Sequence, residues 1–362
     1  MQVHTIADRK QWNGFLTKQQ NGHLLQSYEW GELTSSLGNT VIRLGAFEQD
    51  RLVGTMMLSI ADAPLPVSLP FPHPRWIYCC RGPNLERGHE SALSDLLAEA
   101  HHIAQRENAI VLRLEPNIIE EEDKQEGWSE KFQQLGFSVN PFSMHGRRSW
   151  VLDIRPDLGE LFQHFNKKWR QNIRQAEKRG VNVRMGTSES DFDAFYELLR
   201  STSMQQNFFI HPRSYYARII RTFVESGNGA LLVAEHNQRI VGVNMIIRFG
   251  ARCWDMYSAS LDKRLGLNES YPLQYRCFEW AKAQGCTHFD FRTIPEVLDP
   301  NEEMWGIYEF KKGFGGYSDL VLQTQDYIYR PMLYKGWSLM VKRRRIKRKM
   351  EHHRLMQQKK AA

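Results

Sequence analysis

The amino-acid sequence predicts a mixed α/β protein that contains two tandem copies of one fold. Three observations lead to this prediction. The chain has 362 residues, more than the ~250–300 at which a single hydrophobic core usually stops growing. A hairpin-like segment that begins near residue 44 recurs near residue 232, and the elements that follow each copy come in the same order. With 41% hydrophobic and 12% aromatic residues, the chain also has enough apolar side chains for two cores.

The repeated segment consists of two apolar runs around a polar turn, which is the pattern of a β-hairpin. Its two copies cover residues 44–57 and 232–245. Identical residues recur between them at a constant spacing of 188: Ala46, Arg51, Val53 and Gly54 match Ala234, Arg239, Val241 and Gly242. A repeat of this kind indicates that one structural unit occurs twice.

The elements after each hairpin support the same conclusion. In the first half, a strand at 76–78 is followed by an amphipathic helix and a strand at 109–116; in the second half, strands at 253–257 and 287–295 enclose a helix that ends at Gly285. The helices have apolar residues at helical spacing, namely Leu93, Leu96, Leu97, Ala100, Ile103 and Ala104 in the first and Leu273, Cys277, Trp280 and Ala281 in the second. Hairpin, strand, helix, strand is the order of the GNAT-like acyltransferase fold. The alternative is two ordinary α/β segments that share a similar hairpin.

We therefore expect two tandem GNAT-like domains with mixed sheets flanked by helices. The first domain is expected to cover residues 1–147 and to be joined by 320–341, and the second to cover 148–319. The second is expected to contain a basic helix at 167–179 and two amphipathic helices at 191–204 and 214–225. On the basic helix, three cationic side chains form a stripe: Arg170, Arg174 and Lys178.

A basic C-terminal helix or tail, residues 342–362, follows the second domain. It contains ten Lys or Arg residues and one Glu, a net charge of +9, whereas the whole chain carries +7. The rest of the chain is therefore near neutral. Apolar and aromatic residues at 334–341 lead directly into this tail, and such a combination is typical of contact with an anionic membrane surface. Phosphates of tRNA would satisfy the same charges, Arg343, Arg344 and Arg345 among them. A disordered solubilising tail is the remaining interpretation.

The composition also indicates a cytoplasmic protein, peripheral to the inner face of the membrane if the tail binds lipid. The first fifteen residues lack the apolar run of a signal peptide, and no stretch approaches the ~20 apolar residues of a membrane span. The five cysteines form no Cys-x-x-Cys pair, which argues against a disulfide framework and against a structural metal site.

Acyl-CoA binding is disfavoured by two loops. Acetyl-CoA-dependent members of the fold hold pyrophosphate on a glycine-containing loop at a helix N-terminus. The corresponding segment here, residues 263–268, keeps one glycine of two, and Asn268 would crowd the phosphate. In the first half, Pro83 removes a backbone N–H donor.

Four segments resemble the Fem family, the FemXAB aminoacyltransferases that build peptidoglycan cross-bridges without the ribosome. These segments are Gln-Ser-Tyr-Glu-Trp-Gly at 26–31, Arg-Gly-Pro at 81–83, the basic helix from Trp169 to Val181, and Phe-Lys-Lys-Gly-Phe-Gly-Gly at 310–316. The resemblance implies two GNAT-like domains, aminoacyl-tRNA as the donor, the stem-peptide amine of a peptidoglycan precursor as the acceptor, and no further cofactor. The chain lacks the long helical hairpin that is inserted in FemA, so it is FemX-like.

The resemblance also implies site residues. Phe310 and Lys311 match the pair at the catalytic centre, where Lys311 would face developing negative charge and Phe310 would pack the terminal adenosine or the ester. Glu115, before Pro116, stands where the family commonly has Asp-Pro, and its carboxylate would orient or deprotonate the acceptor amine. The resemblance places further residues in substrate binding: Tyr257, Trp30, Arg81, Gly315 and Gly316.

Each of these residues has a structural alternative. Lys311 would otherwise be a solvated strand lysine, and Phe310 and Tyr257 would be core residues. Glu115 would be a cap or an ion-pair partner, and the stripe on the basic helix a solvated face.

Three positions depart from the family pattern. Thr34, Gln205 and Asp255 stand where a lysine, an arginine and a second tyrosine are usual. Because these positions contact a UDP-linked precursor in FemX-like enzymes, the departures favour a lipid-linked acceptor.

The resulting expectation is an aminoacyltransferase that forms the interpeptide bridge. One alternative is a CoA-dependent N-acyltransferase of envelope polysaccharide or lipid biosynthesis. Another is a non-catalytic relative that binds tRNA or membranes.

Overall fold

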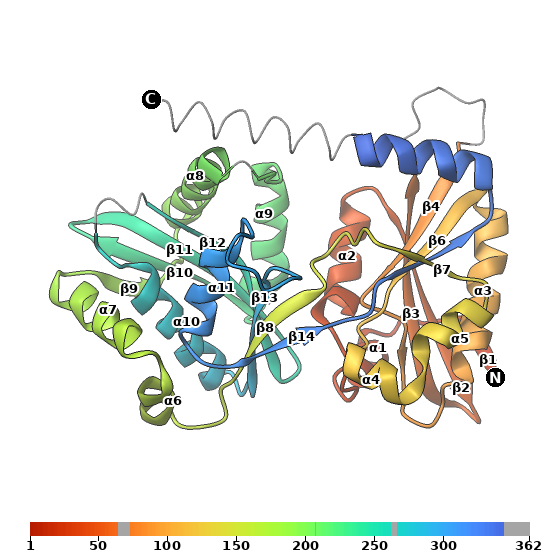
Figure 1. Cartoon of the computed structure of the whole chain (residues 1–362), viewed down its shortest axis with the longest axis horizontal. Helices are drawn as coiled ribbons and strands as arrows, with labels where there is room; N and C mark the ends of the chain where they lie inside the picture. The colour runs from red at the N-terminus through yellow and green to blue at the C-terminus, as the bar shows by residue number, and fades with distance from the viewer. Residues whose placement is uncertain (64–72, 207, 262–265, 344–362) are drawn as a thin grey trace. The chain divides into compact units, whose positions relative to one another are not determined.

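The computed structural model describes residues 1–63, 73–206, 208–261 and 266–343. The chain divides into two compact units, the first formed by Met1–Ser143 and Leu322–Ala362, and the second by Met144–Val321. Each unit has a mixed sheet of its own (Figure 1). Each also has its own hydrophobic core. No helix in the described ranges has both the length and the apolar character that a membrane span requires.

The first unit is organised around an eight-stranded sheet. Its strands are β1 (Gln2–Thr5), β2 (Thr40–Glu48), β3 (Arg51–Asp62), β4 (Arg75–Cys80), β5 (Asn84–Leu85), β6 (Ala109–Glu115), β7 (Ser138–Asn140) and β15 (Thr324–Ile328). Its helices are α1 (Arg9–Leu16), α2 (Tyr28–Ser36), α3 (Ala92–Arg106), α4 (Glu120–Glu126), α5 (Trp128–Gln134) and a helix at 331–343. The strand order is β1-β2-β3-β4-β6-β15-β7, with β5 paired to β3. Because β15 lies between β6 and β7, the end of the chain completes the first sheet.

The second unit is organised around a seven-stranded sheet. Its strands are β8 (Arg148–Asp153), β9 (Asn182–Met185), β10 (Gly229–His236), β11 (Arg239–Phe249), β12 (Arg252–Ser260), β13 (His288–Thr293) and β14 (Tyr317–Leu320). Its helices are α6 (Leu158–His164), α7 (Lys167–Lys178), α8 (Glu189–Gln206), α9 (Arg213–Ile219), α10 (Ser270–Ala283) and α11 (Trp305–Lys312). The strand order is β14-β8-β13-β12-β11-β10-β9.

The structure confirms the repeat in its backbone details. The hairpins β2–β3 and β10–β11 both turn through two residues with positive φ, at 49–50 and 237–238. Two-residue turns of this conformation match the right-handed twist of the flanking strands. Both ladders also shift register at the same place, after Ala46 in the first copy and after Ala234 in the second. The spacing of 188 found in the sequence therefore holds for the turn and for the irregularity beside it.

The matched glycines of the repeat lie beneath a helix in both units. A Cβ on Gly54 would approach Leu96 of α3 to 3.2 Å, and a Cβ on Gly242 would approach Leu273 of α10 to 3.4 Å. Both helices connect parallel strands, β4 with β6 and β12 with β13. The glycines thus allow the crossover helix to pack closely on the sheet.

One predicted helix ends earlier than expected. The segment predicted to be helical over 214–225 forms α9 only as far as Ile219 and continues as a π-helical turn over Ile220–Val224. Of the four apolar residues expected on the inner face of this helix, Tyr216, Ile219 and Phe223 are buried and Ile220 is partly buried. The wider turn changes the hydrogen bonding of the segment but keeps its apolar face.

Aromatic side chains form the centre of the second core. Phe278 makes edge-to-face contacts with four other rings, at centroid distances of 4.9 to 5.9 Å: Phe165, Phe289, Phe291 and Phe314. Such edge-to-face pairs add stabilisation beyond the burial of their area. Because Phe314 comes two residues after Lys312, the last residue of α11, this cluster fixes the end of that helix.

The helix at 331–343 packs on the first unit through its inner face. Trp337 is 5% exposed and lies against Trp76, with ring centroids 5.9 Å apart. The Tyr334 hydroxyl donates a hydrogen bond of 2.6 Å to Asp326 of β15. The helix is therefore part of the folded unit.

Candidate active site

The segment Phe310 to Gly316 occupies the end of α11 and the turn into β14. Phe314 is fully buried, and the Trp150 indole donates a hydrogen bond of 2.7 Å to the carbonyl of Gly315. Gly315 and Gly316 have φ of 88° and 101°, a region that favours glycine. A Cβ on Gly316 would also collide with the backbone carbonyl of Val151. The two glycines are thus required by the backbone itself.

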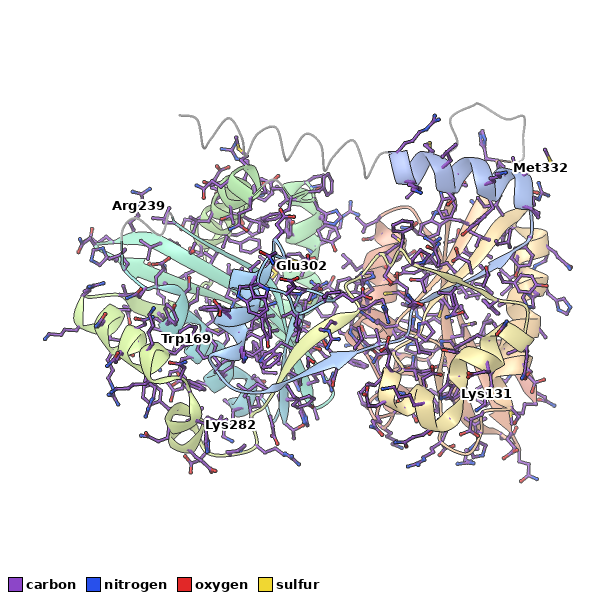
Figure 2. The ribbon with its side chains drawn as sticks, viewed as in Figure 1. Lys131, Trp169, Arg239, Lys282, Glu302 and Met332 are labelled. Atoms are coloured by element: carbon purple, nitrogen blue, oxygen red, sulfur yellow. The ribbon has the colours of Figure 1, made fainter. Side chains whose placement is uncertain are left out.

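Gly313 allows the closest contact of the motif with another part of the unit. A Cβ there would collide with the ring of Trp169 on α7 (labelled in Figure 2). The Trp169 indole donates a hydrogen bond of 2.9 Å to the carbonyl of Phe310. Two of the segments that resemble the Fem family are therefore in direct contact.

Lys311 lies on a helix and its ammonium is held by backbone carbonyls, so the alternative of a solvated strand lysine is wrong. Its Nζ donates hydrogen bonds of 2.7 Å to the carbonyl of Phe291 and 2.7 Å to that of Thr293. The ladder between β13 and β8 is irregular between Asp290 and Thr293, and Arg292 has φ of 62°. This irregularity presents both carbonyls of β13 to α11.

One N–H of the Lys311 ammonium remains without an acceptor. An ammonium has three donors, and the two carbonyls of β13 account for two of them. No other acceptor in the described ranges bonds to Lys311 Nζ. The group is therefore fixed in position while one donor stays available.

Charged groups on β12 and β13 interact with this ammonium. Burial lowers the pKa of Lys311 to about 8, although Asp255 and Asp290 oppose the shift. Burial raises the pKa of Asp255 to about 6, opposed by Lys311, by a hydrogen bond from Asn244 and by Arg292. Perturbed pKa values of this kind cluster at functional sites. The sequence indicated Asp255 only as a departure from the family pattern, and it did not indicate Asp290 or Arg292. The signal that could have found all three is a polar residue inside an otherwise apolar strand.

Phe310 and Tyr257 lie in aromatic clusters of the same unit. Phe310 contacts Tyr271 and Phe314, with ring centroids 5.3 and 5.2 Å away. The Tyr257 hydroxyl shares a hydrogen bond of 3.2 Å with that of Tyr215. Both predicted residues are only partly buried, so each packs against the core and keeps some exposed surface.

Two predicted residues of the first unit lie at the ends of the parallel strands β4 and β6, and the third lies on α2. Glu115, at the end of β6, is 3% exposed and accepts a hydrogen bond of 2.6 Å from the Tyr78 hydroxyl. Arg81 is buried and has φ of 54°. Trp30 lies in the first turn of α2, where its backbone N–H is capped by Ser27 at 3.1 Å.

Gln26 organises this part of the first unit. Its side chain is fully buried, accepts a hydrogen bond of 3.2 Å from the N–H of Met57 and donates one to the carbonyl of Cys80. A Cβ on Gly82 would come within 2.9 Å of the same side chain. The segments 26–31 and 81–83, found separately in the sequence, are therefore in contact.

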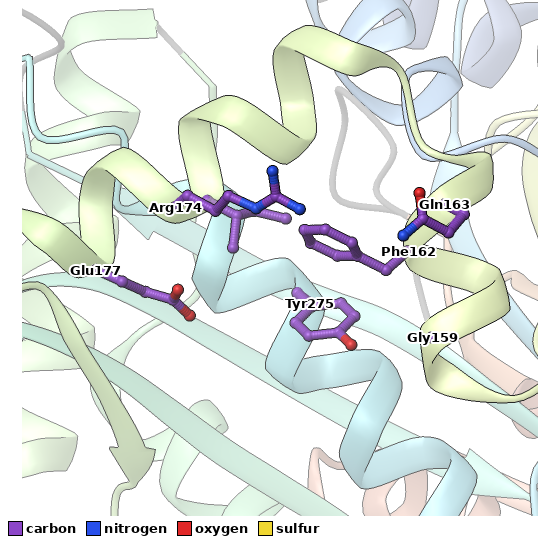
Figure 3. A pocket seen from close by; sticks show the side chains of 7 residues that line it. Gly159, Phe162, Gln163, Arg174, Glu177 and Tyr275 are labelled. Atoms are coloured by element: carbon purple, nitrogen blue, oxygen red, sulfur yellow. The ribbon is translucent and has the colours of Figure 1, made fainter.

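The basic stripe on α7 is partly engaged by its own unit. Arg170 donates a hydrogen bond of 2.7 Å to Gln163, and the Arg174 guanidinium lies 5.4 Å from the ring of Phe162. Arg174, Phe162 and Tyr275 line an open hollow of about 290 Å³ (Figure 3). In the described part of the chain, neither these two arginines nor Lys178 forms an ion pair.

The structure reaches only the beginning of the basic tail. Lys342 and Arg343 are exposed at the end of the last helix. Arg344 and Arg345 lie outside the described residues, as do residues 263–265 of the loop compared above with a pyrophosphate-binding loop.

Comparison with known proteins gives a consistent result. The model of the FemAB family matches residues 8–240 and 230–342. A Staphylococcus aureus protein named lipid II:glycine glycyltransferase is 22% identical over 397 residues, covering 89% of this chain and 92% of its own. The crystal structure of FemX superimposes with a TM-score of 0.81 at 20% identity, covering 92% of this chain and 99% of that one. A tandem GNAT protein from the clavulanic acid pathway gives a TM-score of 0.53 at 12% identity, covering 90% and 97%. The two tandem GNAT-like domains predicted from the sequence are confirmed.

Proposed function

Because the chain belongs to the FemAB family and is an aminoacyltransferase, we propose that it moves an amino acid from aminoacyl-tRNA to the stem-peptide amine of a peptidoglycan precursor. The product is an interpeptide bridge, and the acceptor is the lipid-linked precursor. The S. aureus relative, which is matched over nearly its whole length, is named for lipid II and for glycyl transfer.

The observation that carries the proposal is the single free N–H of the fixed Lys311 ammonium. In aminolysis, the acceptor amine attacks the ester carbon and the carbonyl oxygen gains negative charge. Donors that are already in place for this oxyanion lower the barrier without reorganising. The bond from carbon to the ribose oxygen of the tRNA then breaks, and the amine proton leaves with that oxygen. No covalent enzyme intermediate is needed.

The remaining predicted residues are assigned to binding. Glu115, with its partner Tyr78, is assigned to the acceptor amine. Phe310 offers a partly exposed ring for the donor, and Tyr257 offers one for the precursor. We assign four further residues to substrate binding: Gly315, Gly316, Trp30 and Arg81. The stripe formed by Arg170, Arg174 and Lys178 is assigned to tRNA phosphates, because its charges have no carboxylate partners in the described ranges.

The last helix is assigned to the membrane that carries the acceptor. On its outer face, Met332 (labelled in Figure 2) is 90% exposed and Leu339 is 50% exposed. Lys335, Lys342 and Arg343 are exposed beside them. Apolar side chains next to basic ones bind an anionic bilayer by burial and by charge together.

Replacing Met332 and Leu339 together with glutamate is expected to weaken binding to anionic vesicles by about tenfold or more, because apolar burial is lost and two negative charges are added. Sedimentation with phosphatidylglycerol vesicles measures the effect. Met204→Glu is the matched control, since Met204 is 69% exposed on α8 and lies outside the helix at 331–343. Equal binding of the double variant and the control would contradict the assignment.

The transfer rate is expected to fall above pH about 8. The ammonium form of Lys311 dominates only below its pKa of about 8, so the oxyanion donor is lost as the pH rises through that value. The measurement is kcat between pH 6 and 9 with acceptors that differ in the pKa of their amine. If the fall in kcat at high pH comes from Lys311, its midpoint pH is the same for all acceptors. A midpoint that shifts with the pKa of the acceptor amine would contradict this origin.

The function itself is tested by supplying different donors to the purified protein. The precursor is incubated with aminoacyl-tRNA, with the same tRNA after RNase treatment, or with acetyl-CoA, and its mass is measured. We expect the mass of one aminoacyl residue to be added only with intact aminoacyl-tRNA. Acetylation from acetyl-CoA would instead establish the CoA-dependent alternative.

A further inference from the structure

Lys311 and Asp255 form an unusual pair in the second unit, because they carry opposite charges and interact without forming an ion pair. Each shifts the pKa of the other toward the charged form. In the described ranges, however, no ion pair joins the Lys311 ammonium to the Asp255 carboxylate. The backbone carbonyls of β13 hold the ammonium on its own side.

In the described ranges, only one of the two oxygens of the Asp255 carboxylate accepts a hydrogen bond. Its Oδ2 accepts a hydrogen bond of 3.4 Å from the side-chain amide of Asn244, which is 2% exposed on the adjacent strand β11. No donor in the described part of the chain bonds to Oδ1 of Asp255. Asp255 as a residue is only partly buried, and its Oδ1 is not among the buried side-chain atoms without a partner in the described ranges, so this oxygen can be reached by a ligand.

In the described ranges, neighbouring charged residues bind neither the free N–H of Lys311 nor Oδ1 of Asp255. Asp290 is engaged by the backbone N–H of Arg292 at 2.7 Å and by Arg252 at 3.6 Å. Arg292 donates a hydrogen bond of 3.2 Å to the carbonyl of Met256. A donor N–H on Lys311 and an acceptor oxygen on Asp255 therefore remain. They belong to neighbouring parts of the sheet, because β12, which carries Asp255, pairs with β13, whose carbonyls hold the Lys311 ammonium.

The ligand that complements this pair carries a carbonyl oxygen and a cationic nitrogen a few bonds apart. An aminoacyl ester has both groups, since its α-ammonium is attached to the carbon next to the ester carbonyl. We propose that Asp255 binds the α-ammonium of the donor's aminoacyl group while Lys311 binds its carbonyl oxygen. The assignment rests on the proposed function and adds to it the group by which the donor is selected.

This arrangement explains why an α-amino acyl group would be chosen over a plain acyl group. A simple acyl ester offers only the carbonyl oxygen and leaves the partly buried Asp255 carboxylate without a partner. Sites that present a charged partner reject ligands that lack the matching group, because the partner is then desolvated without compensation. Asp255 is therefore a specificity-determining residue.

The test compares two donors on one RNA microhelix, an alanyl ester and the lactyl ester in which a hydroxyl replaces the α-ammonium. For the wild-type protein we expect kcat/KM to favour the alanyl ester by about 10- to 100-fold, the range for a hydrogen bond to a charged group. In Asp255→Asn this preference is expected to fall to about threefold or less. Asp255→Glu, which keeps the charge, is expected to keep part of it.

The matched control is Asp319→Asn. Asp319 is a partly buried carboxylate on β14 whose charge interacts with Arg252 and Asp290 but not with Lys311. We expect this variant to keep the wild-type preference. Thermal unfolding of each variant shows that a lost preference does not reflect lost folding.

The outcomes separate this inference from the function on which it rests. If the wild-type protein uses neither ester but accepts acetyl-CoA, the proposed function fails. If the wild-type protein uses both esters equally, or if Asp255→Asn keeps the preference, the function stands and the role of Asp255 is wrong. An equal loss with both donors in Asp255→Asn would also overturn it, since that result would indicate an effect on Lys311 alone.

Discussion

Replacing Lys311 with methionine is expected to lower kcat for aminoacyl transfer by about 100- to 1,000-fold, the usual effect of removing one oxyanion donor. Methionine is also unbranched and only slightly shorter than lysine, but it has no N–H for the developing charge. It also leaves the carbonyls of Phe291 and Thr293 without the partner that holds them at 2.7 Å. Steady-state transfer with purified components measures kcat, and thermal unfolding measures the accompanying loss of stability.

Lys312→Met is the matched control for this experiment. Lys312 is the next residue of α11, is exposed, and lies 5.5 Å from the ring of Tyr308. Its ammonium forms no hydrogen bond to β13 in the described ranges, so we expect kcat to stay within about twofold of wild type. If Lys311→Met keeps the wild-type kcat, or if the two variants lose kcat equally, Lys311 takes no part in the reaction.

Replacing Asp326 with alanine is expected to destabilise the first unit by about 3–5 kcal/mol, the usual cost of breaking a buried ion pair. Asp326 is 1% exposed and accepts two hydrogen bonds of 2.7 Å from Arg113 of β6. Asn140 and Tyr334 donate further bonds of 2.8 and 2.6 Å. Without the carboxylate, the Arg113 charge stays buried and unpaired. The free energy of unfolding in urea measures the loss.

Glu121→Ala provides the comparison for Asp326. Glu121 pairs with Lys124 at 3.1 Å on α4, and both side chains are largely exposed. Exposed pairs contribute about 0–1 kcal/mol, so we expect little change. A loss below about 1 kcal/mol in Asp326→Ala would mean that the buried network does not hold β15 and the last helix in place.

The fold was predictable because its determinants are local and repeat at a fixed spacing. Gly54 and Gly242 mark the same contact between strand and helix in the two units, and the hairpin turns need only two adjacent residues with positive φ. Periodic apolar residues identified α3 and α10 for the same reason. The π-helical turn after Ile219 was missed, because an apolar face continues through it unchanged.

The site was only partly predictable because its contacts join distant parts of the chain. The motif identified Lys311, but its two carbonyl partners depend on an irregularity of β13 that no local pattern indicates. Asp255 was noticed only as a departure from the family pattern, and its relation to Lys311 follows from the neighbouring positions of β12 and β13. Arg113 and Asp326 are 213 residues apart, so their pairing could not be read from either segment.

Mass spectrometry of muropeptides tests the central claim most directly, because it reports both the reaction and the residue added. Cells are compared with the gene present, with the gene deleted, and with the Lys311→Met variant in its place. We expect stem peptides that carry an added amino acid only when the wild-type gene is present. Identical muropeptides in all three strains would contradict the proposal that this protein is a peptidoglycan aminoacyltransferase.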